Sequence, residues 1–331
     1  MTGEEDGGTR RTTLAPGVDP FAALGWDSTW AEVFVLLPGT PARVTRMDHG
    51  RARALTRSGP VSATPAGDLD RLVTGDWVAI TGDDTGPATV TAMAPRRTAL
   101  VRRDPGDEPA PQALAANMDQ VWITHAAGQP LRAGWLDRAL VVAYGSGATP
   151  VIVVSKADLA PDVGTLTNEI AALAPGVALV ITSIVDARGL DTLGTRLQGG
   201  RCAALLGRSG AGKSSLVNAL SGGTDQRTGT VRTTDGRGRH TTTRRALVIV
   251  GGGSVIDTPG LRALGLWEPK MGLRLAFPEI SELAAGCRFN DCRHQNEPDC
   301  AVLLARDTGR LSSDRYRRYI TLSIPDQTQR R

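Results

Sequence analysis

The sequence is poor in lysine, cysteine and aromatic residues, and it contains no long apolar run. No stretch approaches the roughly 20 apolar residues that a membrane-spanning helix needs, so we expect no membrane partner. The N-terminal residues 1–6 are acidic where a secretory signal is basic and then apolar, so we expect a cytoplasmic protein. Aromatic residues make up 4% of the chain, and a net charge of +4 is too small to indicate nucleic-acid binding by itself.

Basic residues are almost all arginine. Only Lys156, Lys213 and Lys270 are lysines. In a chain so rich in arginine, a retained lysine indicates a position that needs a compact point charge. Lys156 and Lys213 each fall within a motif described below.

The 331 residues are 40% apolar and 22% charged, so the chain can bury two or three cores without disulfides. Residues 1–28 are rich in Gly, Thr, Pro and acidic residues with no hydrophobic period, which predicts a disordered arm. Between Trp30 and Arg103, short β-like runs alternate with turn residues and predict a small barrel. An OB-like fold is the leading candidate, although a generic β-barrel spacer fits the same pattern. The expected strands lie at 32–36, 42–44, 76–80 and 88–91.

Strands and helices alternate in the centre of the chain, after a linker at Pro105–Pro111. Near-continuous apolar runs predict a mostly parallel sheet that is covered by helices on both faces. The strands are expected at 121–124, 151–154, 177–181 and 203–206, the helices at 136–141, 166–173 and 216–220, and a hairpin at 246–250 and 255–257. The expected division is an arm at 1–28, an OB-fold domain at 29–103, an α/β domain at 112–268 and a helical domain with the cysteine cluster at 269–331.

The segment between an apolar strand and a predicted helix matches the pattern G-x-x-x-x-G-K-[ST]. Glycines in such a loop let backbone N–H groups wrap a phosphate, and the N-terminus of the next helix adds a positive dipole end. We expect Lys213 to bridge the β- and γ-phosphates of a nucleotide and the Ser214 hydroxyl to hold Mg²⁺. A chance glycine-rich turn is the alternative, but the flanking strand and helix argue against it. The expected nucleotide contacts are Gly207, Arg208, Ser209, Gly210, Ala211, Gly212, Lys213, Ser214 and Ser215.

The tetrapeptide Ser155-Lys156-Ala157-Asp158 follows an apolar strand and resembles the Asn-Lys-x-Asp motif that selects guanine. The Asp158 carboxylate would accept from N1–H and the exocyclic amine of guanine, whereas adenine offers no such donor pair. Lys156 would pack its stem over the base. Ser155 stands where Asn is usual, so whether the tether made by that Asn persists is open at this point. Thr182 and Ser183 close the next strand and are expected to form a second base-contacting loop.

A second phosphate-related motif, Asp257-Thr258-Pro259-Gly260, closes another apolar strand. An acid here can hold the Mg²⁺ shell through water, and Gly260 can donate its N–H toward the γ-phosphate. By itself the tetrapeptide is only a turn, and its pairing with the phosphate loop makes it a metal and switch motif. Thr241 and Thr242 are candidates for the mobile threonine that completes the Mg²⁺ shell, and we assign Thr242. A loop that faces RNA, or a disordered loop, fits that segment as well.

The order of these motifs is unusual, because the base motif and the second base loop precede the phosphate loop. A site depends on spatial position, so a circularly permuted chain builds the same pocket when the original termini are close. Leu261 stands where many GTPases carry the Gln that orients the attacking water. An apolar side chain cannot do this, so we expect slow intrinsic hydrolysis, with the missing group supplied by a partner or elsewhere in the chain. His240 is one candidate, and a structural or RNA-contacting role fits it equally.

Three cysteines and one histidine are spaced as C-x4-C-x-H-x5-C: Cys287, Cys292, His294 and Cys300. Three thiolates and an imidazole suit one tetrahedral structural Zn²⁺ that has no open position. Unligated thiols in a reducing compartment are the alternative. Cys202 lies apart in an apolar run and is expected to be a core thiol. Downstream, the Arg-Tyr-Arg-Arg-Tyr segment at 315–319 fits an RNA contact or a solvated helix face equally well.

Together, these features resemble the circularly permuted GTPases of small ribosomal subunit biogenesis, the RsgA (YjeQ) family. The resemblance covers almost all of the chain from Trp30 to Leu322. It depends on the permuted motif order, on the zinc spacing and on the segments Gly75–Val78, Pro95–Arg97, Ala115–Asp119 and Phe277–Ile280.

The resemblance implies an N-terminal OB-fold barrel, a central circularly permuted P-loop GTPase domain and a C-terminal zinc-binding helical domain. It also implies a GTP phosphohydrolase that docks on the small ribosomal subunit and its 16S rRNA near the decoding region, is stimulated by that particle and dissociates after hydrolysis. We expect a monomer that uses Mg²⁺ with GTP and one structural Zn²⁺.

Two other functions fit the residues. One is a nucleotide-gated RNA-binding switch with negligible turnover, which Ser155 and Leu261 permit. The other is a P-loop enzyme that acts on a small molecule. Against the latter, we find no acid–base pair beyond the nucleotide motifs.

Overall fold

The computed structural model describes residues 19–67, 69–82, 87–104, 110–222, 245–258 and 265–324. These residues fall into two compact units. The first takes its residues from the ranges 1–95, 190–202 and 214–259, and the second from 96–189, 203–213 and 260–331. Within the described ranges, no helix is both long enough and apolar enough to span a bilayer.

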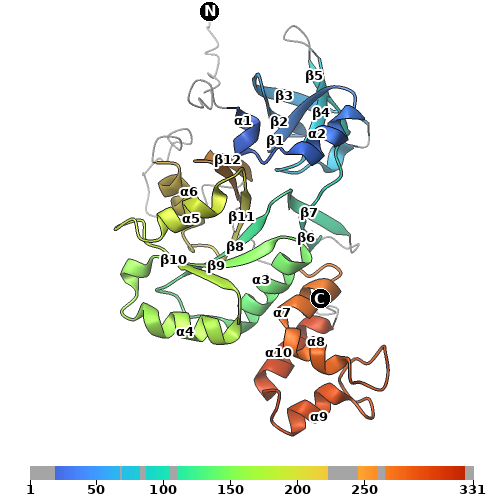
Figure 1. Cartoon of the computed structure of the whole chain (residues 1–331), viewed down its shortest axis with the longest axis vertical. Helices are drawn as coiled ribbons and strands as arrows, with labels where there is room; N and C mark the ends of the chain where they lie inside the picture. Colours follow the sequence, from blue (N-terminus) through green and yellow to red (C-terminus); the bar gives the residue numbers. More distant parts are fainter. Residues whose placement is uncertain are drawn as a thin grey trace, which may run out of the picture. The chain divides into compact units, whose positions relative to one another are not determined.

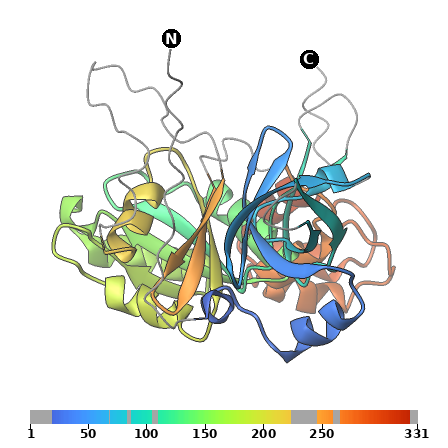
Figure 2. The same ribbon diagram turned by 90° about the horizontal axis from the view of Figure 1, so that it is seen from above.

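Five strands of the first unit close into a barrel in the order β1-β2-β3-β5-β4 (Figures 1 and 2). Small and β-branched side chains fill its core, among them Val44, Ala54 and Val90. β3 and β5 pair in parallel, and the other neighbours pair antiparallel. The predicted OB-like barrel is confirmed. Its elements are β1 (Thr40–Asp48), β2 (Arg51–Thr56), β3 (Gly59–Pro65), the 3-10 helix η1 (Leu69–Arg71), β4 (Trp77–Thr81) and β5 (Ala88–Met93).

Helix α1 (Pro20–Ala23) lies in the segment that we predicted as part of a disordered arm. Asp19 caps this helix by accepting a hydrogen bond from the Phe21 N–H at 3.0 Å. Phe21 and Leu24 are buried, and the Phe21 ring meets the Trp77 ring edge to face with centroids 5.1 Å apart. Residues 20–24 are therefore ordered by apolar burial around Trp77, and residues 1–18 lie outside the described part of the chain.

Helix α2 (Ser28–Val35) replaces the strand that we predicted at 32–36, so that prediction is wrong. The Asp27 carboxylate accepts from the Trp30 N–H at 2.9 Å and caps the helix. Trp30 and Phe34 are one helical turn apart, and both rings lie against Trp77. The helical spacing of two large aromatic side chains outweighs the β-propensity of the intervening apolar run.

A hairpin and two helices complete the first unit: α5 (Leu190–Leu197), α6 (Lys213–Leu220), β12 (Ala246–Val250) and β13 (Gly253–Asp257). The two strands pair antiparallel from end to end, which confirms the predicted hairpin. A Cβ on Gly253 would collide with the carbonyl oxygens of Leu197 and Arg201, so the hairpin packs closely on the end of α5. This packing fixes the strand that ends at Asp257.

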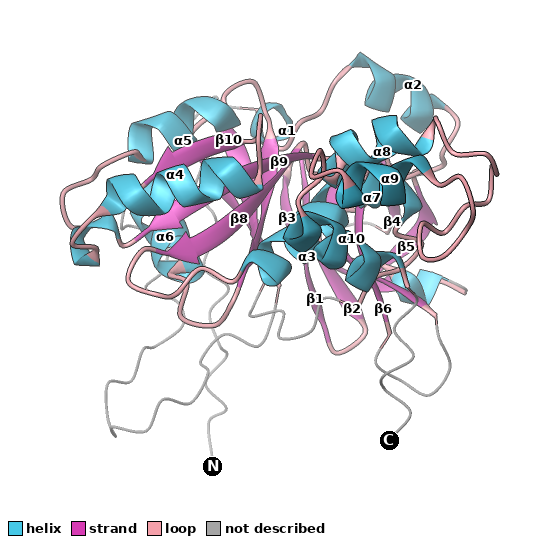
Figure 3. Cartoon of the chain, turned by 90° about the horizontal axis from the view of Figure 1, so that it is seen from below, coloured by secondary structure: helices cyan, strands magenta, loops and turns pink. Residues whose placement is uncertain are grey.

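The second unit contains four parallel strands in the order β10-β9-β8-β11. Every residue of β8 is buried, as expected for a strand that is covered on both faces. Helix α3 packs on β8 and β9 (Figure 3). The predicted mostly parallel α/β sheet is confirmed. Its elements are β8 (Gln120–Ala126), α3 (Ala133–Gly145), β9 (Thr149–Ser155), the 3-10 helix η2 (Ala157–Leu159), α4 (Val163–Leu173), β10 (Ala178–Ile181) and β11 (Cys202–Gly207).

Two further strands, β6 (Ala99–Arg103) and β7 (Pro111–Ala116), form a separate antiparallel pair in this unit. They flank the predicted linker at 105–111, of which residues 105–109 lie outside the described part of the chain. β6 pairs with β7 and is not one of the five barrel strands. Both strands belong to the second unit, so the part of the chain that forms the barrel ends before β6 begins.

Four helices end the second unit: α7 (Lys270–Ala276), α8 (Pro278–Ala284), α9 (Ala301–Asp307) and α10 (Ser313–Ser323). Helix α7 crosses α3 closely at Gly272, where a Cβ would collide with the Val141 carbonyl oxygen. The segment between α8 and α9 carries the cysteines. These helices confirm the predicted helical character of the C-terminal part.

Candidate functional site

The phosphate loop connects the end of β11 to the start of α6. A Cβ on Gly207 would lie 2.6 Å from the Thr124 carbonyl oxygen on β8, so this close approach of two strands requires glycine. Gly210 and Gly212 have φ angles of +79° and +76°, which other residues rarely adopt. The glycines of the motif therefore allow the backbone conformation in which successive N–H groups can bind one phosphate.

Lys213 is buried at the start of α6, and the loop itself holds its ammonium group. Nζ donates to the carbonyl oxygens of Gly207 at 2.8 Å and Arg208 at 3.2 Å. The positive charge thus lies within the loop, beside the N-terminus of a helix. Both features favour an anionic ligand at this position.

Ser214 and Asp257, both in the first unit, are joined by a hydrogen bond. Ser214 Oγ donates to Asp257 Oδ2 at 2.7 Å. Asp257 is buried, and among the described residues its other oxygen, Oδ1, has no hydrogen-bond partner. An unsatisfied buried carboxylate oxygen is costly, and hard cations such as Mg²⁺ bind oxygen ligands of this kind. The pair therefore fits the expected Mg²⁺ site.

Several expected site residues lie outside the described part of the chain. They are Thr242 and Gly260 of the expected catalytic set, together with His240, Thr241 and Leu261.

Ser155 lies at the end of β9 and contacts the phosphate loop directly. Its hydroxyl donates to the Ala211 carbonyl oxygen at 2.8 Å and lies 3.3 Å from the His125 carbonyl oxygen. The shorter contact joins the base motif to the phosphate loop. The Lys156 stem runs along the same loop, with Cε 3.5 Å from the position that a Cβ on Gly212 would occupy. The structure thus forms a tether with serine at the position where Asn is usual.

The rest of the base motif contacts the loop after β10. The Ala157 N–H donates to the Thr182 carbonyl oxygen at 3.0 Å, which holds the two loops together. Ser183 Oγ donates to Asp158 Oδ1 at 2.7 Å. Asp158 is exposed, so its carboxylate is oriented by Ser183 and still accessible to the donors of a ligand. This geometry suits a base with two adjacent N–H groups.

Two residues close to the phosphate loop belong to none of the motifs, namely His125 and Gln129. His125 Nε2 donates to the Gln129 carbonyl oxygen at 3.1 Å. Burial lowers the pKa of His125, and the nearby Arg208 charge acts in the same direction, so the imidazole is neutral at pH 7. Gln129 Nε2 lies 3.5 Å from the position of a Cβ on Gly210. The one sequence signal for these residues is their place at the carboxyl end of a parallel strand, where α/β sheets bind ligands.

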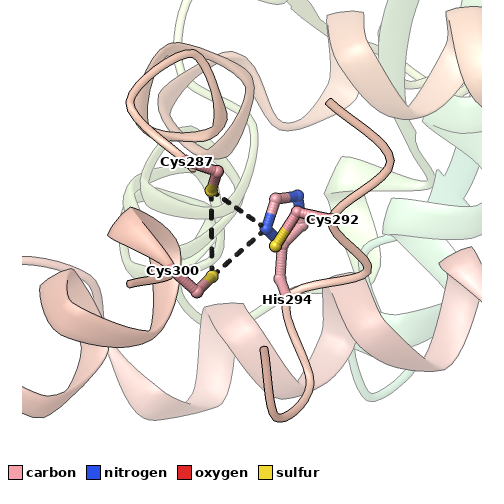
Figure 4. Close-up of side chains that lie close together, drawn as sticks. All are labelled: Cys287, Cys292, His294 and Cys300. Atoms are coloured by element: carbon pink, nitrogen blue, oxygen red, sulfur yellow. Dashed lines mark hydrogen bonds between the residues drawn. The ribbon is translucent and has the colours of Figure 1, made fainter. Parts of the chain in front are cut away.

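The predicted zinc ligands come together between α8 and α9 (Figure 4). The ligand atoms of Cys287, Cys292, His294 and Cys300 all lie within 4.8 Å of one another. Cys287 Sγ and Cys300 Sγ are 3.8 Å apart, and His294 Nδ1 is 3.5 Å and 3.4 Å from these two sulfurs. Metal bonds of about 2.3 Å to sulfur and 2.0–2.1 Å to nitrogen in a tetrahedron give edges of this length. The cluster therefore fits one four-coordinate metal ion.

Glu297 organises the loop that carries His294. Its carboxylate accepts from the N–H groups of Arg293 at 2.9 Å and Gln295 at 2.9 Å. These bonds lower the pKa of Glu297 to about 2, because the backbone donors stabilise the charged form. The charged carboxylate thus holds the backbone on both sides of a ligand.

The Arg-Tyr-Arg-Arg-Tyr segment lies on α10, where two of its arginines pair with a buried carboxylate. Arg315 Nη1 lies 2.9 Å from Asp137 Oδ1, and Arg318 Nε lies 2.6 Å from Asp137 Oδ2. Asp137, on α3, is 1% exposed. The Arg315 guanidinium also covers the Phe277 ring at 3.9 Å and pairs with Glu279 at 2.6 Å. These contacts fix α10 on α3.

The tyrosines of the same segment border the metal cluster. The Tyr316 hydroxyl donates to the His294 carbonyl oxygen at 2.7 Å, and the Tyr319 ring lies 6.1 Å from the His294 ring. The two tyrosines and the half-buried Arg315 and Arg318 contact other parts of the second unit, so a solvated helix face does not describe them. Arg317, whose side chain is 72% exposed, remains at the surface.

Comparison with known proteins identifies similar sequences over most of the chain. A family profile described as RsgA GTPase matches residues 93–267. The small ribosomal subunit biogenesis GTPase RsgA of Streptomyces coelicolor is 42% identical over 321 residues, which cover 92% of this chain and 86% of that protein. A protein of the same name from Methanosarcina acetivorans is 38% identical over 307 residues, which cover 90% of this chain and 83% of that protein.

Two solved structures are similar in fold. YjeQ from Thermotoga maritima has a TM-score of 0.63 and 26% identity, and the match covers 86% of this chain and 97% of that one. YloQ, described as a circularly permuted GTPase, has a TM-score of 0.60 and 26% identity, with 86% and 93% covered. The matched share of this chain exceeds residues 93–267, so the structural likeness extends beyond the α/β part.

Proposed function

The chain belongs to the RsgA GTPase family, and from this premise we propose that it hydrolyses GTP during late maturation of the small ribosomal subunit. The observation that carries the nucleotide part is the hydrogen bond from Ser155 to Ala211. It joins a guanine-type motif to a phosphate loop although the two motifs occur in permuted order along the chain. The ribosomal part is supported by relatives whose names describe small-subunit biogenesis.

Two groups of residues would recognise GTP, one at the base and the other at the phosphates. At the base, Asp158 accepts from guanine, the Lys156 stem covers the ring, and Thr182 and Ser183 border it together with Ser155 and Ala157. The exposed and oriented carboxylate of Asp158 supports this assignment. At the phosphates, the backbone N–H groups of residues 207–215 and the Lys213 ammonium provide the donors.

Ser214 and Asp257 would hold the Mg²⁺ that accompanies GTP, which would neutralise charge on the β- and γ-phosphates. The buried Asp257 Oδ1, which lacks a hydrogen-bond partner among the described residues, supports this role. Thr242 and Gly260 complete the proposed catalytic set. Asp257 and Ser214 orient each other before any ligand arrives, so little rearrangement is required on binding.

Turnover in this proposal depends on the ribosomal partner. Leu261 cannot orient an attacking water, so the isolated chain hydrolyses GTP slowly. Contact with 16S rRNA near the decoding region of the small subunit supplies the missing group or positions one in the chain. Hydrolysis then lowers the affinity for the subunit, and the protein dissociates.

The metal cluster takes a structural role in the proposal. Cys287, Cys292, His294 and Cys300 hold one Zn²⁺, since three thiolates and an imidazole suit that ion and leave no position open for catalysis. We further propose a cytoplasmic monomer. Its functional parts are an OB-fold domain at 29–103, a GTPase domain at 112–268 and a zinc domain at 269–331.

The test is the turnover of GTP and of ATP, each measured with and without purified small ribosomal subunits. We expect hydrolysis that is selective for GTP and that rises when subunits are added. Equal use of ATP would contradict the guanine assignment, and no response to subunits would contradict the ribosomal one. GTP-dependent binding to subunits without turnover would favour a nucleotide-gated RNA-binding switch instead.

A further inference from the structure

The loop after β8, residues 126–129, lies against the base motif. The Ala127 N–H donates to the Ser155 carbonyl oxygen at 2.8 Å. A Cβ on Gly128 would lie 3.8 Å from the Leu159 Cβ, which is ordinary van der Waals contact. This loop is therefore packed against the residues that follow β9, and its position is set by them.

The side chain of Gln129 extends from this loop toward the phosphate loop. Its Nε2 lies 3.5 Å from the position of a Cβ on Gly210, which places a neutral N–H₂ donor at the loop. Gln129 is half-buried, and the described residues give this amide nitrogen no hydrogen-bond acceptor. The Gln129 amide can therefore donate a hydrogen bond to an acceptor atom of a bound ligand.

The backbone of Gln129 is fixed on two sides, so its side chain starts from a defined point. The Gln129 N–H donates to the Ala126 carbonyl oxygen at 3.0 Å, and the Gln129 carbonyl oxygen accepts from the buried His125 ring at 3.1 Å. These two bonds hold the Gln129 backbone beside the phosphate loop, so ligand binding requires no movement of the backbone at this residue.

We propose that the Gln129 carboxamide donates an N–H to a phosphate oxygen of the bound nucleotide. The inference rests on the proposed function, which places the phosphates of GTP or GDP in the loop from Gly207 to Ser214. Gly210 belongs to that loop and lies next to the Gln129 amide. Because it is a glycine, no side chain separates this amide from a ligand in the loop. Hydrogen bonds to a charged acceptor are stronger than neutral ones, so one such donor contributes measurably to affinity.

The competing role for Gln129 is packing, in which the side chain only supports the loop at Gly210. Two substitutions separate these roles. Gln129→Met keeps the length and packing of the side chain but has no N–H donor, whereas Gln129→Ala removes both the donor and the packing. A donor to phosphate predicts that both substitutions weaken GDP binding about equally, whereas a packing residue predicts that Gln129→Met binds GDP as tightly as the wild type does.

The experiment is calorimetric titration of GDP, and separately of ADP, into the full-length protein in the presence of Mg²⁺. We expect Gln129→Ala and Gln129→Met each to weaken GDP binding by about tenfold, because one charge-assisted hydrogen bond corresponds to about that factor. The matched control is Gln198→Met, the same substitution at an exposed residue beyond the end of α5, which should leave GDP binding unchanged. Thermal unfolding of each ligand-free variant checks that the fold is intact.

The outcomes distinguish this inference from the proposed function. If the wild-type protein does not prefer GDP to ADP, the proposed function fails, and the Gln129 inference fails with it. If the wild type prefers GDP but Gln129→Met binds GDP as tightly as the wild type, only the Gln129 inference is overturned.

Discussion

The Ser155 hydroxyl and the Ala211 carbonyl oxygen are 2.8 Å apart, although 56 residues separate them along the chain. The bond connects the end of β9 to the phosphate loop after β11, and Ser155 is almost fully buried. A hydroxyl offers one proton where an Asn side chain offers two. Serine therefore keeps one contact with the phosphate loop and no second side-chain donor.

The Ser155→Ala variant tests this bond. Because the substitution leaves the Ala211 carbonyl oxygen without its hydroxyl donor, we expect GDP affinity to fall by about fivefold, the equivalent of about 1 kcal/mol. Isothermal titration would measure it, with Ser313→Ala at an exposed position as the control. Unchanged GDP affinity would show that the bond does not support the nucleotide site.

The Lys213→Ala variant should abolish GTP turnover. The substitution removes the ammonium group that lies within the phosphate loop and that, in the proposed function, contacts the β- and γ-phosphates. Phosphate release measures the turnover, and metal analysis of the same sample measures bound zinc. Since the metal cluster uses none of the phosphate-loop residues, zinc content should remain at the wild-type value, and its loss would contradict this separation of roles.

The Asp137→Ala variant should destabilise the protein strongly. The change leaves the guanidinium groups of Arg315 and Arg318 without the buried carboxylate that both of them contact. Breaking a buried ion pair from one side costs about 3–5 kcal/mol of unfolding free energy. Urea denaturation would measure the loss, with Asp191→Ala on the exposed face of α5 as the control. A loss no larger than that of the control would show that Asp137 does not hold α10 on α3.

His125 makes stability depend on pH in a predictable direction. Burial lowers its pKa below the ordinary value of 6.5, so the unfolded chain takes up the proton first. Stability from this residue is therefore complete above pH 6.5 and falls as the pH drops below it, by at most about 1.4 kcal/mol per pH unit. His125→Gln should reduce this slope, as measured by urea denaturation between pH 8 and pH 6, and an unchanged slope would contradict this role of His125.

Glu297→Gln should speed the release of metal to a chelator at pH 7. The neutral amide accepts the backbone N–H groups of Arg293 and Gln295 more weakly than the carboxylate does. Glu282→Gln on α8 is the matched control. Because the pKa of Glu297 is lowered from 4.5 to about 2, its contribution is complete above about pH 5 and is lost only as the pH falls from 4.5 toward 2. The difference between variant and wild type should thus be equal at pH 8 and pH 6, and a difference that appears only at one of them would contradict the assignment.

The sequence by itself determined the local chemistry and the family. A phosphate loop and a metal cluster each require particular atoms at fixed short spacings, so they can be recognised within about 15 residues of chain. The order of the motifs identified a circularly permuted GTPase, and family membership is confirmed. The parallel sheet followed from apolar runs and the barrel from short strands between turns, since both patterns reflect burial along a single element.

Only the tertiary structure decided the features that depend on residues far apart in the chain. The segment at 32–36 is helical because Trp30 and Phe34 pack on Trp77, which is more than 40 residues away. Arg315 and Arg318 of α10 are half-buried because they pair with Asp137 on a distant helix. The sequence around these two arginines does not indicate this partner. Sequence spacing shows which side chains one segment carries. The burial and the hydrogen bonds that stabilise those side chains come from residues that are distant in the sequence and that the fold brings into contact with them.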